Sequence, residues 1–215
     1  MLIPREFLLG FSESGFQFEM GLPGSEDPNS DWWTWARDRE NVLSGIVSGD
    51  LPENGPGYWD LYRSDHDIAS KLGMNCARIG VEWSRVFPKP TLDIRVDVDR
   101  DEDGNIVWVD VNYGVLEKLD RTANVDSMNH YKSILEDWKG RGGKVVLNLN
   151  HFTLPLWIHD PITLRTNGPS RAPSGWLSED TVVEFAKYAT YVAWKLDDLV
   201  DLYSTLNEPN VVYTA

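Results

Sequence analysis

The chain has 215 residues, of which 41% are hydrophobic and 25% are charged, and its formal net charge is −14 because 34 acidic residues stand against 20 basic ones. This composition is typical of a soluble globular protein with one substantial core. The acidic balance, without any stretch rich in Lys or Arg, argues against binding to nucleic acid or to an anionic membrane, because both require a positive field.

Cysteine content and the N-terminal sequence bear on the compartment. Cys76 is the single cysteine, so no internal disulfide can form, which suits a reducing environment. The first residues contain no apolar signal-peptide segment. No uninterrupted apolar run approaches the roughly 20 residues that a membrane-spanning helix needs. We therefore expect a cytoplasmic protein.

Strand-like and helix-like segments alternate along the chain. Short apolar runs predict buried strands, whereas apolar residues three or four positions apart predict amphipathic helices. In chain order the segments are a strand at 7–11, a helix at 58–72, a strand at 77–83, a helix around 128–138, a strand at 144–150, a helix at 182–196 with Ser178 as its N-cap, and a strand at 202–207. This alternation predicts a parallel sheet with right-handed crossovers, either open or closed into a barrel.

Polar residues follow the predicted strands. Glu82 comes after the second strand, Asn150 and His151 after the third, and Asn207 and Glu208 after the fourth. The carboxyl ends of parallel strands are where barrel enzymes place their active sites. No G-x-G-x-x-G turn follows the first strand, which argues against a dinucleotide-binding fold.

An acidic insertion at about 90–124 separates the second strand from its helix. Within it, Asp99 to Asp110 nearly fits a calcium-binding loop, but the last position is Asp rather than the bidentate Glu. The flanks carry β-type residues, and Asp103-Gly104 is a hairpin turn signal. We predict a solvated β-hairpin here, with a calcium-binding scaffold as the weaker alternative.

The sharpest candidate for chemistry is Asn207-Glu208-Pro209. A general acid for a glycosidic bond must be a carboxyl group that stays protonated near neutral pH, and an adjacent amide can bind a sugar hydroxyl. Taken alone, the tripeptide is more typical of a turn with an exposed acid.

Several further motifs, in the same order along the chain, resemble those of glycoside hydrolase family 1. Thr205-Leu-Asn-Glu-Pro209 resembles the acid/base motif of that family. The other matching segments are Ser14-Gly-Phe-Gln17-Phe-Glu19, Ala77-Arg78-Ile-Gly-Val-Glu-Trp-Ser-Arg85-Val-Phe-Pro88 and Leu154-Pro155-Leu-Trp157. Longer matches point to the archaeal, heat-stable branch: Gly21-Leu-Pro-Gly-Ser-Glu-Asp-Pro-Asn29, Ser48-Gly-Asp-Leu-Pro-Glu-Asn-Gly-Pro56 and Trp157-Ile-His-Asp-Pro161.

The resemblance implies a (β/α)8 TIM barrel, of which residues 1–215 would form the N-terminal half, with strands one to four of a single catalytic domain. It implies a retaining β-glycosidase that hydrolyses β-glucosides, β-galactosides or short oligosaccharides without a metal or other cofactor. The sequence does not distinguish glucosides from galactosides. The complete enzyme would need the C-terminal barrel half, from the same gene or a separate chain, and we expect it to be a homo-oligomer.

The resemblance also implies roles for individual residues. Glu208 would be the catalytic acid/base and Asn207 the partner of the sugar 2-hydroxyl. Gln17 and His151 would bind other hydroxyls of the same sugar. Arg78 would orient the nucleophile, and Trp32 would lie near the aglycone.

Two departures from the family pattern affect this reading. Archaeal relatives typically have Tyr-His-Trp-Pro where this chain has Asn150-His151-Phe152-Thr153, so Phe152 can still stack on a sugar but lacks the indole N–H. The nucleophile motif Glu-Asn-Gly expected near strand seven is absent. Glu53-Asn54-Gly55 has the same letters but lies between prolines, in a loop. We therefore expect this chain alone to be inactive, and a non-catalytic sugar-binding relic or one half of a split enzyme remain alternatives.

Overall fold

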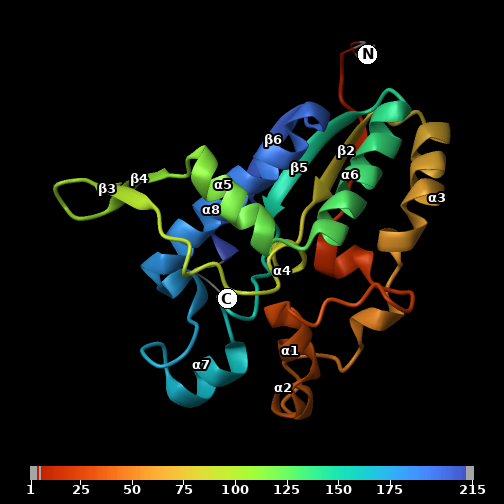
Figure 1. Cartoon of the computed structure of the whole chain (residues 1–215). Helices are drawn as coiled ribbons and strands as arrows, with labels where there is room; N and C mark the ends of the chain where they lie inside the picture. The colour runs from red at the N-terminus through yellow and green to blue at the C-terminus, as the bar shows by residue number, and fades with distance from the viewer. Residues whose placement is uncertain (1–3, 5, 212–215) are drawn as a thin grey trace.

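The computed structural model describes residues 4 and 6–211. Its centre is a four-stranded sheet in the order β1 (Gly10–Ser12), β2 (Cys76–Gly80), β5 (Lys144–Asn150) and β6 (Leu202–Leu206). Each strand pairs in parallel with the next one along the sheet (Figure 1). The predicted parallel sheet is confirmed, and its sequential strand order is that of half a (β/α)8 barrel.

The three predicted crossover helices are also confirmed. They are α3 (Tyr58–Lys71), α6 (Val125–Gly140) and α8 (Glu179–Leu196), each joining one strand to its parallel neighbour. Asn124 caps α6, because its side chain accepts a hydrogen bond from the backbone N–H of Ser127. Ser178 lies at the N-cap position of α8 as predicted, but its side chain makes no capping hydrogen bond.

The first strand differs from the prediction. Residues 7–11 were expected to form a buried strand, yet pairing begins at Gly10, and Phe7, Leu8 and Leu9 are 50%, 46% and 48% exposed. The reason is positional, since β1 is an edge of this sheet and residues 7–9 precede its pairing with β2. The second strand ends earlier than predicted, because the chain turns after Val81 into the short helix α4 (Trp83–Val86).

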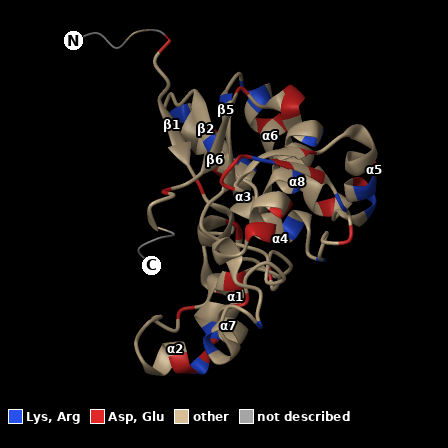
Figure 2. Cartoon of the chain, turned by 90° about the vertical axis from the view of Figure 1, so that its left-hand side faces the viewer, with Lys and Arg blue, Asp and Glu red and all other residues tan. Residues whose placement is uncertain are grey.

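Several short elements connect the strands and helices. Figures 1 and 2 show α1 (Asp31–Arg37), α2 (Arg39–Leu43) and α7 (Pro161–Asn167) grouped in a lobe below the sheet. The remaining elements are α5 (Tyr113–Thr122), the π-helical turn η1 (Gly15–Glu19) and the 3-10 turns η2 (Pro52–Asn54), η3 (Gly175–Leu177) and η4 (Asp197–Leu199). None of the described helices is long and apolar enough to cross a bilayer.

The predicted hairpin is present in the acidic insertion. Strands β3 (Asp97–Arg100) and β4 (Ile106–Asp110) pair antiparallel and project from the molecule (Figure 1). The Asp101 carboxylate accepts hydrogen bonds from the backbone N–H groups of Asp103 and Asn105, so this carboxylate stabilises the turn. Among the described residues no group of three or more His, Cys, Asp or Glu side chains could hold a metal ion. The calcium-loop alternative therefore has no support.

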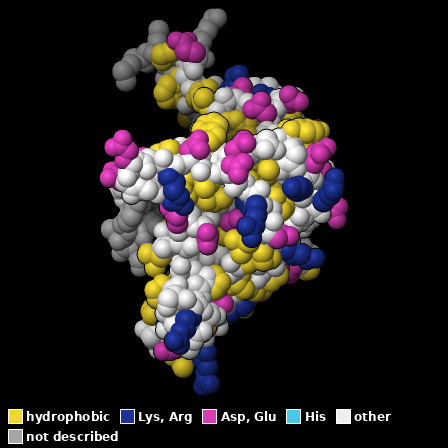
Figure 3. Space-filling view, turned by 60° about the vertical axis from the view of Figure 1, so that its left-hand side comes forward, with side chains coloured by type: hydrophobic (Ala, Val, Ile, Leu, Met, Phe, Trp, Pro, Cys, Tyr) yellow, Lys and Arg dark blue, Asp and Glu magenta, His cyan; other side chains and the backbone are white. Residues whose placement is uncertain are grey.

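On the face shown in Figure 3, acidic and basic side chains are scattered among apolar patches. Two lysines bind Asp201, the residue that immediately precedes β6. The Asp201 carboxylate accepts hydrogen bonds from the ammonium groups of Lys139, at 2.8 Å, and Lys144, at 2.7 Å. Burial alone would raise the pKa of Asp201, but these two hydrogen bonds hold it well below its usual range.

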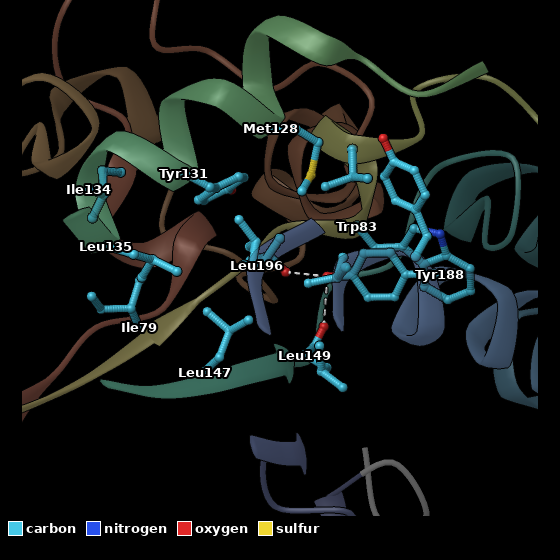
Figure 4. Close-up of a cluster of buried hydrophobic side chains, with 14 of the residues drawn as sticks. Ile79, Trp83, Met128, Tyr131, Ile134, Leu135, Leu147, Leu149, Tyr188 and Leu196 are labelled. Atoms are coloured by element: carbon cyan, nitrogen blue, oxygen red, sulfur yellow. Dashed lines mark hydrogen bonds between the residues drawn. The ribbon is translucent and has the colours of Figure 1, made fainter. Parts of the chain in front are cut away.

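The core lies between the sheet and the helices (Figure 4). All five apolar positions predicted on one face of α6 are buried; they are Met128, Tyr131, Ile134, Leu135 and Trp138. They pack with strand residues such as Ile79 and Leu147 in one cluster.

Tyr188 of α8 connects this core to the sheet. Its ring stacks on Trp83 with centroids 5.1 Å apart. Its hydroxyl lies 2.7 Å from the carbonyl oxygen of Val81 and 3.0 Å from that of Leu149, at the carboxyl ends of β2 and β5. A side chain of α8 thus holds together the strand ends on which the polar residues stand.

Removing this hydroxyl should therefore be costly. We expect Tyr188→Phe to lower the free energy of unfolding by about 1–2 kcal/mol, because a buried hydrogen bond is lost while the ring packing remains. Tyr113→Phe is the matched control, because Tyr113 is 64% exposed. Chemical unfolding of both variants measures the difference. Equal stability of the two variants would show that the Tyr188 bridge contributes nothing.

Candidate active site

The side chain of Arg78 lies at the centre of the polar strand ends. One terminal nitrogen of its guanidinium donates to Asn148 Oδ1 at 2.6 Å and to Asn207 Oδ1 at 3.0 Å. The other donates to Ser12 Oγ at 3.3 Å. A single side chain from β2 therefore contacts residues of β1 and β5 and the residue that follows β6. Ser12 and Asn148 were not predicted site residues, although Asn148 is a polar interruption in an otherwise apolar strand.

Asn207 and Glu208 follow the last described strand. The backbone N–H of Asn207 donates to the carbonyl of Asn150 at 2.9 Å, which extends the pairing of β6 with β5 by one step. Glu208 then adopts a φ of 45°, a left-handed conformation that is uncommon for a residue other than glycine. Its side chain is exposed. The backbone thus turns sharply at the predicted acid/base.

His151 and Phe152 follow β5 in a strained turn. Phe152 has a φ of 72°, and the N–H of Thr153 donates to the carbonyl of His151 at 2.9 Å. A bond across one residue with positive φ is the rare form of the γ-turn, and strain of this kind costs on the order of 1–3 kcal/mol. The side-chain amide of Asn150 donates to the carbonyl of Thr153 at 2.8 Å and closes the turn.

His151 differs from the other histidines. The rings of His66 and His159 are hydrogen-bonded to Asp137 and Asp31, and His130 is hydrogen-bonded to the carbonyl of Trp59. In contrast, the buried Nδ1 of His151 has no hydrogen-bond partner among the described residues.

The surroundings of His151 favour its neutral form. Burial lowers its pKa, the Arg78 charge lowers it further, and the nearby Glu208 charge acts in the opposite direction. A neutral imidazole at neutral pH can donate through one nitrogen and accept through the other. This ring is therefore equipped to bind a hydroxyl group.

Aromatic side chains form one wall beside this turn. The rings of Phe152 and Trp32 are nearly parallel, with centroids 5.8 Å apart. Phe16 meets Trp32 edge-on at 5.6 Å. Trp32 and Phe152 line a cavity of about 500 Å³ together with Trp176 from η3. The predicted aglycone-side residue and the predicted sugar-stacking residue thus lie in contact.

Gln17 lies in the turn η1, where its side chain is exposed. Its Oε1 accepts a hydrogen bond from Ser14 Oγ at 2.6 Å. Among the described residues it makes no hydrogen bond to the other predicted site residues. Its turn nevertheless reaches the aromatic wall, because Phe16 packs on Trp32.

Buried carboxyl groups lie below these turns. Glu13, Glu19 and Glu82 are at most 4% exposed, and Arg85 pairs with Glu19 at 2.6 Å. Tyr131 also donates to Glu19, at 2.8 Å. The sequence alone assigned no role to Glu13, which lies beside the Ser14–Glu19 segment, or to Glu19, which lies within it, since an acidic residue gives no local signal of burial.

The pKa values of these acids are displaced upwards. Burial raises the pKa of Glu82 to about 8, and the charge of Glu19 adds to the effect. Burial also raises the pKa of Glu13 well above its usual value, again with a contribution from Glu19. Protonated carboxyls are therefore part of the folded structure near neutral pH.

This protonation predicts a pH dependence of stability. In the unfolded chain Glu82 loses its proton near pH 4.5, its ordinary pKa, whereas in the folded chain it keeps the proton up to about pH 8. Between these values the folded state binds more protons, so the free energy of unfolding falls as pH rises, by a few kcal/mol. Glu82→Gln removes this titration, so its unfolding free energy should fall less between about pH 5 and 8. Identical pH slopes for the two proteins, measured by chemical unfolding, would contradict the assignment.

Comparisons with known proteins show the family of the chain. The sequence model of glycosyl hydrolase family 1 (the family model) matches residues 1–95 and 119–215. The chain belongs to this family. The unmatched residues 96–118 contain the β3–β4 hairpin, so the hairpin departs from the common family pattern.

Three relatives show how much of a family member is present. A β-galactosidase of Sulfolobus acidocaldarius is 54% identical over 99% of this chain and 43% of its own length. The crystal structure of the β-glycosidase from Thermosphaera aggregans matches with a TM-score of 0.97 and 60% identity, over 99% of this chain and 44% of that one. The β-glucosidase of Pyrococcus furiosus matches with a TM-score of 0.97 and 62% identity, over 99% and 45%. The chain thus spans less than half the length of these relatives.

Proposed function

We propose that this chain supplies the N-terminal half of a retaining β-glycosidase, with Glu208 as the acid/base. The observation that carries the proposal is the Arg78 network, in which one guanidinium holds Asn207 at the strand end that presents Glu208. Family membership and the names of the relatives, β-galactosidase and β-glucosidase, support β-glucosides and β-galactosides as substrates.

The chemistry follows from the roles of two carboxyl groups. Retaining glycosidases hold them about 5–5.5 Å apart, one as acid/base and the other as nucleophile. Glu208 would protonate the leaving oxygen while the nucleophile attacks the anomeric carbon. Glu208 would then take a proton from water, which releases the sugar with retained configuration. Glu208 is exposed, so its carboxyl group is accessible to a sugar and to a second carboxylate.

The sugar itself would be held by the residues around Arg78. Asn207 would bind the 2-hydroxyl through its amide N–H, since its oxygen accepts from Arg78. His151 and Gln17 would bind further hydroxyls, with Phe152 and Trp32 as the aromatic surface. Arg78 would orient the nucleophile. No step in this mechanism calls for a metal or a cofactor.

The nucleophile would come from the strands that complete the barrel. Glu53 is not a substitute, because it lies in η2 and forms an ion pair with Arg37. The completing half would belong to the same gene or to a separate chain, and we expect the complete enzyme to self-associate. A non-catalytic sugar-binding protein would need the hydroxyl-binding residues but not Glu208.

The acid/base role is tested by Glu208→Gln in the enzyme completed with the remaining strands. Substrates with poor leaving groups should slow on the order of 10²–10⁴-fold, because the proton donor is lost. An activated aryl glycoside should be much less affected in its first step, and azide should rescue the second. Glu53→Gln is the matched control and should retain turnover. Equal losses for both substrate types without azide rescue would remove Glu208 from this role.

The requirement for a second half is tested with residues 1–215 alone. This protein should not hydrolyse an aryl β-glucoside, because none of the described carboxyl groups is placed as a nucleophile opposite Glu208. It should also self-associate through the two edge strands, β1 and β6, since Leu9, which precedes β1, and Leu202, in β6, are 48% and 55% exposed. Size-exclusion chromatography and hydrolysis are measured with and without the complementary half. An active monomer from 1–215 alone would refute the two-carboxylate assignment.

A further inference from the structure

Glu82 contacts two of the segments that carry the proposed sugar-binding residues. It is 3% exposed and follows β2 directly, at the N-cap position of α4. Its Oε1 accepts a hydrogen bond from the backbone N–H of Phe16 at 3.3 Å. Its Oε2 lies 2.6 Å from the hydroxyl of Thr153. The two oxygens of one buried carboxyl group therefore contact two separate loops.

Each of these two loops carries proposed sugar-binding residues next to its contact with Glu82. Phe16 immediately precedes Gln17, and Thr153 follows His151 and Phe152. The approach of the first loop is close, because a Cβ atom built on Gly15 would lie 2.1 Å from Glu82 Cγ. Glycine is required at this position for the loop to pass over the carboxyl group.

The second loop needs external support because of its strain. The turn at Phe152 has a φ of 72°, and such conformations persist only where the surroundings determine them. Thr153 is held at three atoms: its N–H by His151, its carbonyl by Asn150 and its hydroxyl by Glu82. Proline, expected here from the family pattern, has neither the N–H nor the hydroxyl. Two of these three contacts thus depend on Thr153.

We propose that Glu82 is a positioning residue, which fixes the Gln17 loop and the His151–Phe152 turn relative to each other and so determines the discrimination between sugar hydroxyls. The inference rests on the proposed function. It predicts that Glu82 acts without touching the substrate, through the hydrogen bonds to Phe16 and Thr153.

The protonation of Glu82 defines the conservative variant. With a pKa of about 8, the carboxyl group is mostly neutral at pH 7. In the structure the Thr153 hydroxyl donates to Oε2, but a hydroxyl can also accept, so the protonated carboxyl group can donate to it while the other oxygen accepts from Phe16. Glutamine has the same shape and offers the same donor and acceptor, whereas methionine fills the volume and offers neither.

The test compares Glu82→Gln, Glu82→Met, Thr153→Val and the Met/Val double variant in the completed enzyme. The readout is the ratio of kcat/KM for an aryl β-glucoside to that for the matching β-galactoside, measured well below the melting temperature. The Met and Val variants should each change this ratio about two- to tenfold, the effect of one hydrogen bond. Glutamine should keep the ratio of the wild type, and the double variant should resemble the Met variant, because both residues act through one contact.

Thr91→Val is the matched control for a merely structural role. Thr91 is also buried, and its hydroxyl donates to the buried Glu184 of α8 at 2.6 Å. This variant should lower the melting temperature without changing the substrate ratio. An unchanged ratio in both Glu82→Met and Thr153→Val would overturn the proposal, as would a ratio that the Thr91 variant changes equally.

A structural readout separates this inference from the proposed function. If the completed wild-type enzyme hydrolyses neither glycoside, the proposed function fails, and crystal structures of the same variants decide the positioning role. In Glu82→Met and Thr153→Val, Phe152 should leave its positive φ; in Glu82→Gln it should keep it. A positive φ in all of them would show that Glu82 does not hold the turn.

Discussion

The hydrogen bonds of the Arg78 guanidinium are the constraint on which the candidate site depends. Parallel strands bring their carboxyl ends to one edge, but pairing alone does not orient the side chains that project from them. Arg78 does so by donating to Ser12, Asn148 and Asn207. A guanidinium suits this position because its donors lie in a rigid plane and it remains charged at every physiological pH. Its charge also lowers the pKa of His151, so the same side chain sets both geometry and protonation.

The acidic residues buried below the site are held there against the unfavourable free energy of burying a charged carboxylate. Three glutamates below the site are almost fully buried, and Arg85 pairs with one of them. Burial of a charged carboxylate without a partner is strongly unfavourable, so protonation is the alternative, which the raised pKa values of Glu13 and Glu82 express. A protonated carboxyl group can link two loops, because it donates one hydrogen bond and accepts another. Glu82 is such a group, and its hydrogen bond with Thr153 lies next to the strained backbone at Phe152.

The insertion hairpin is attached to the fold independently of the site. Arg100 forms a bidentate ion pair with Glu179 at the start of α8. Below it, the buried ammonium of Lys187 donates to the carbonyl oxygens of Thr91 and Ile94. The Arg100 pair joins the segment that the family model does not match, residues 96–118, to a helix that it does match, whereas Thr91 and Ile94 lie in the matched part of the chain. The hairpin is therefore attached to α8 through this pair, and the Asp101 carboxylate in its turn accepts hydrogen bonds from backbone N–H groups of the same turn.

The sequence by itself determined the strand and helix alternation, the buried face of α6, the hairpin and the family motifs, because these are encoded by residues close together in the chain. It did not determine where burial stops at an edge, so the exposure of Phe7, Leu8 and Leu9 was missed. It could name Arg78 and Asn207 only by resemblance, because they lie 129 positions apart and meet through the sheet. The turn at Phe152 and the contact of Glu82 with Thr153 were decided by the tertiary structure, since a carboxyl group 71 positions away holds that turn in place. Contacts at such separations depend on strand register and loop path, which no local pattern contains.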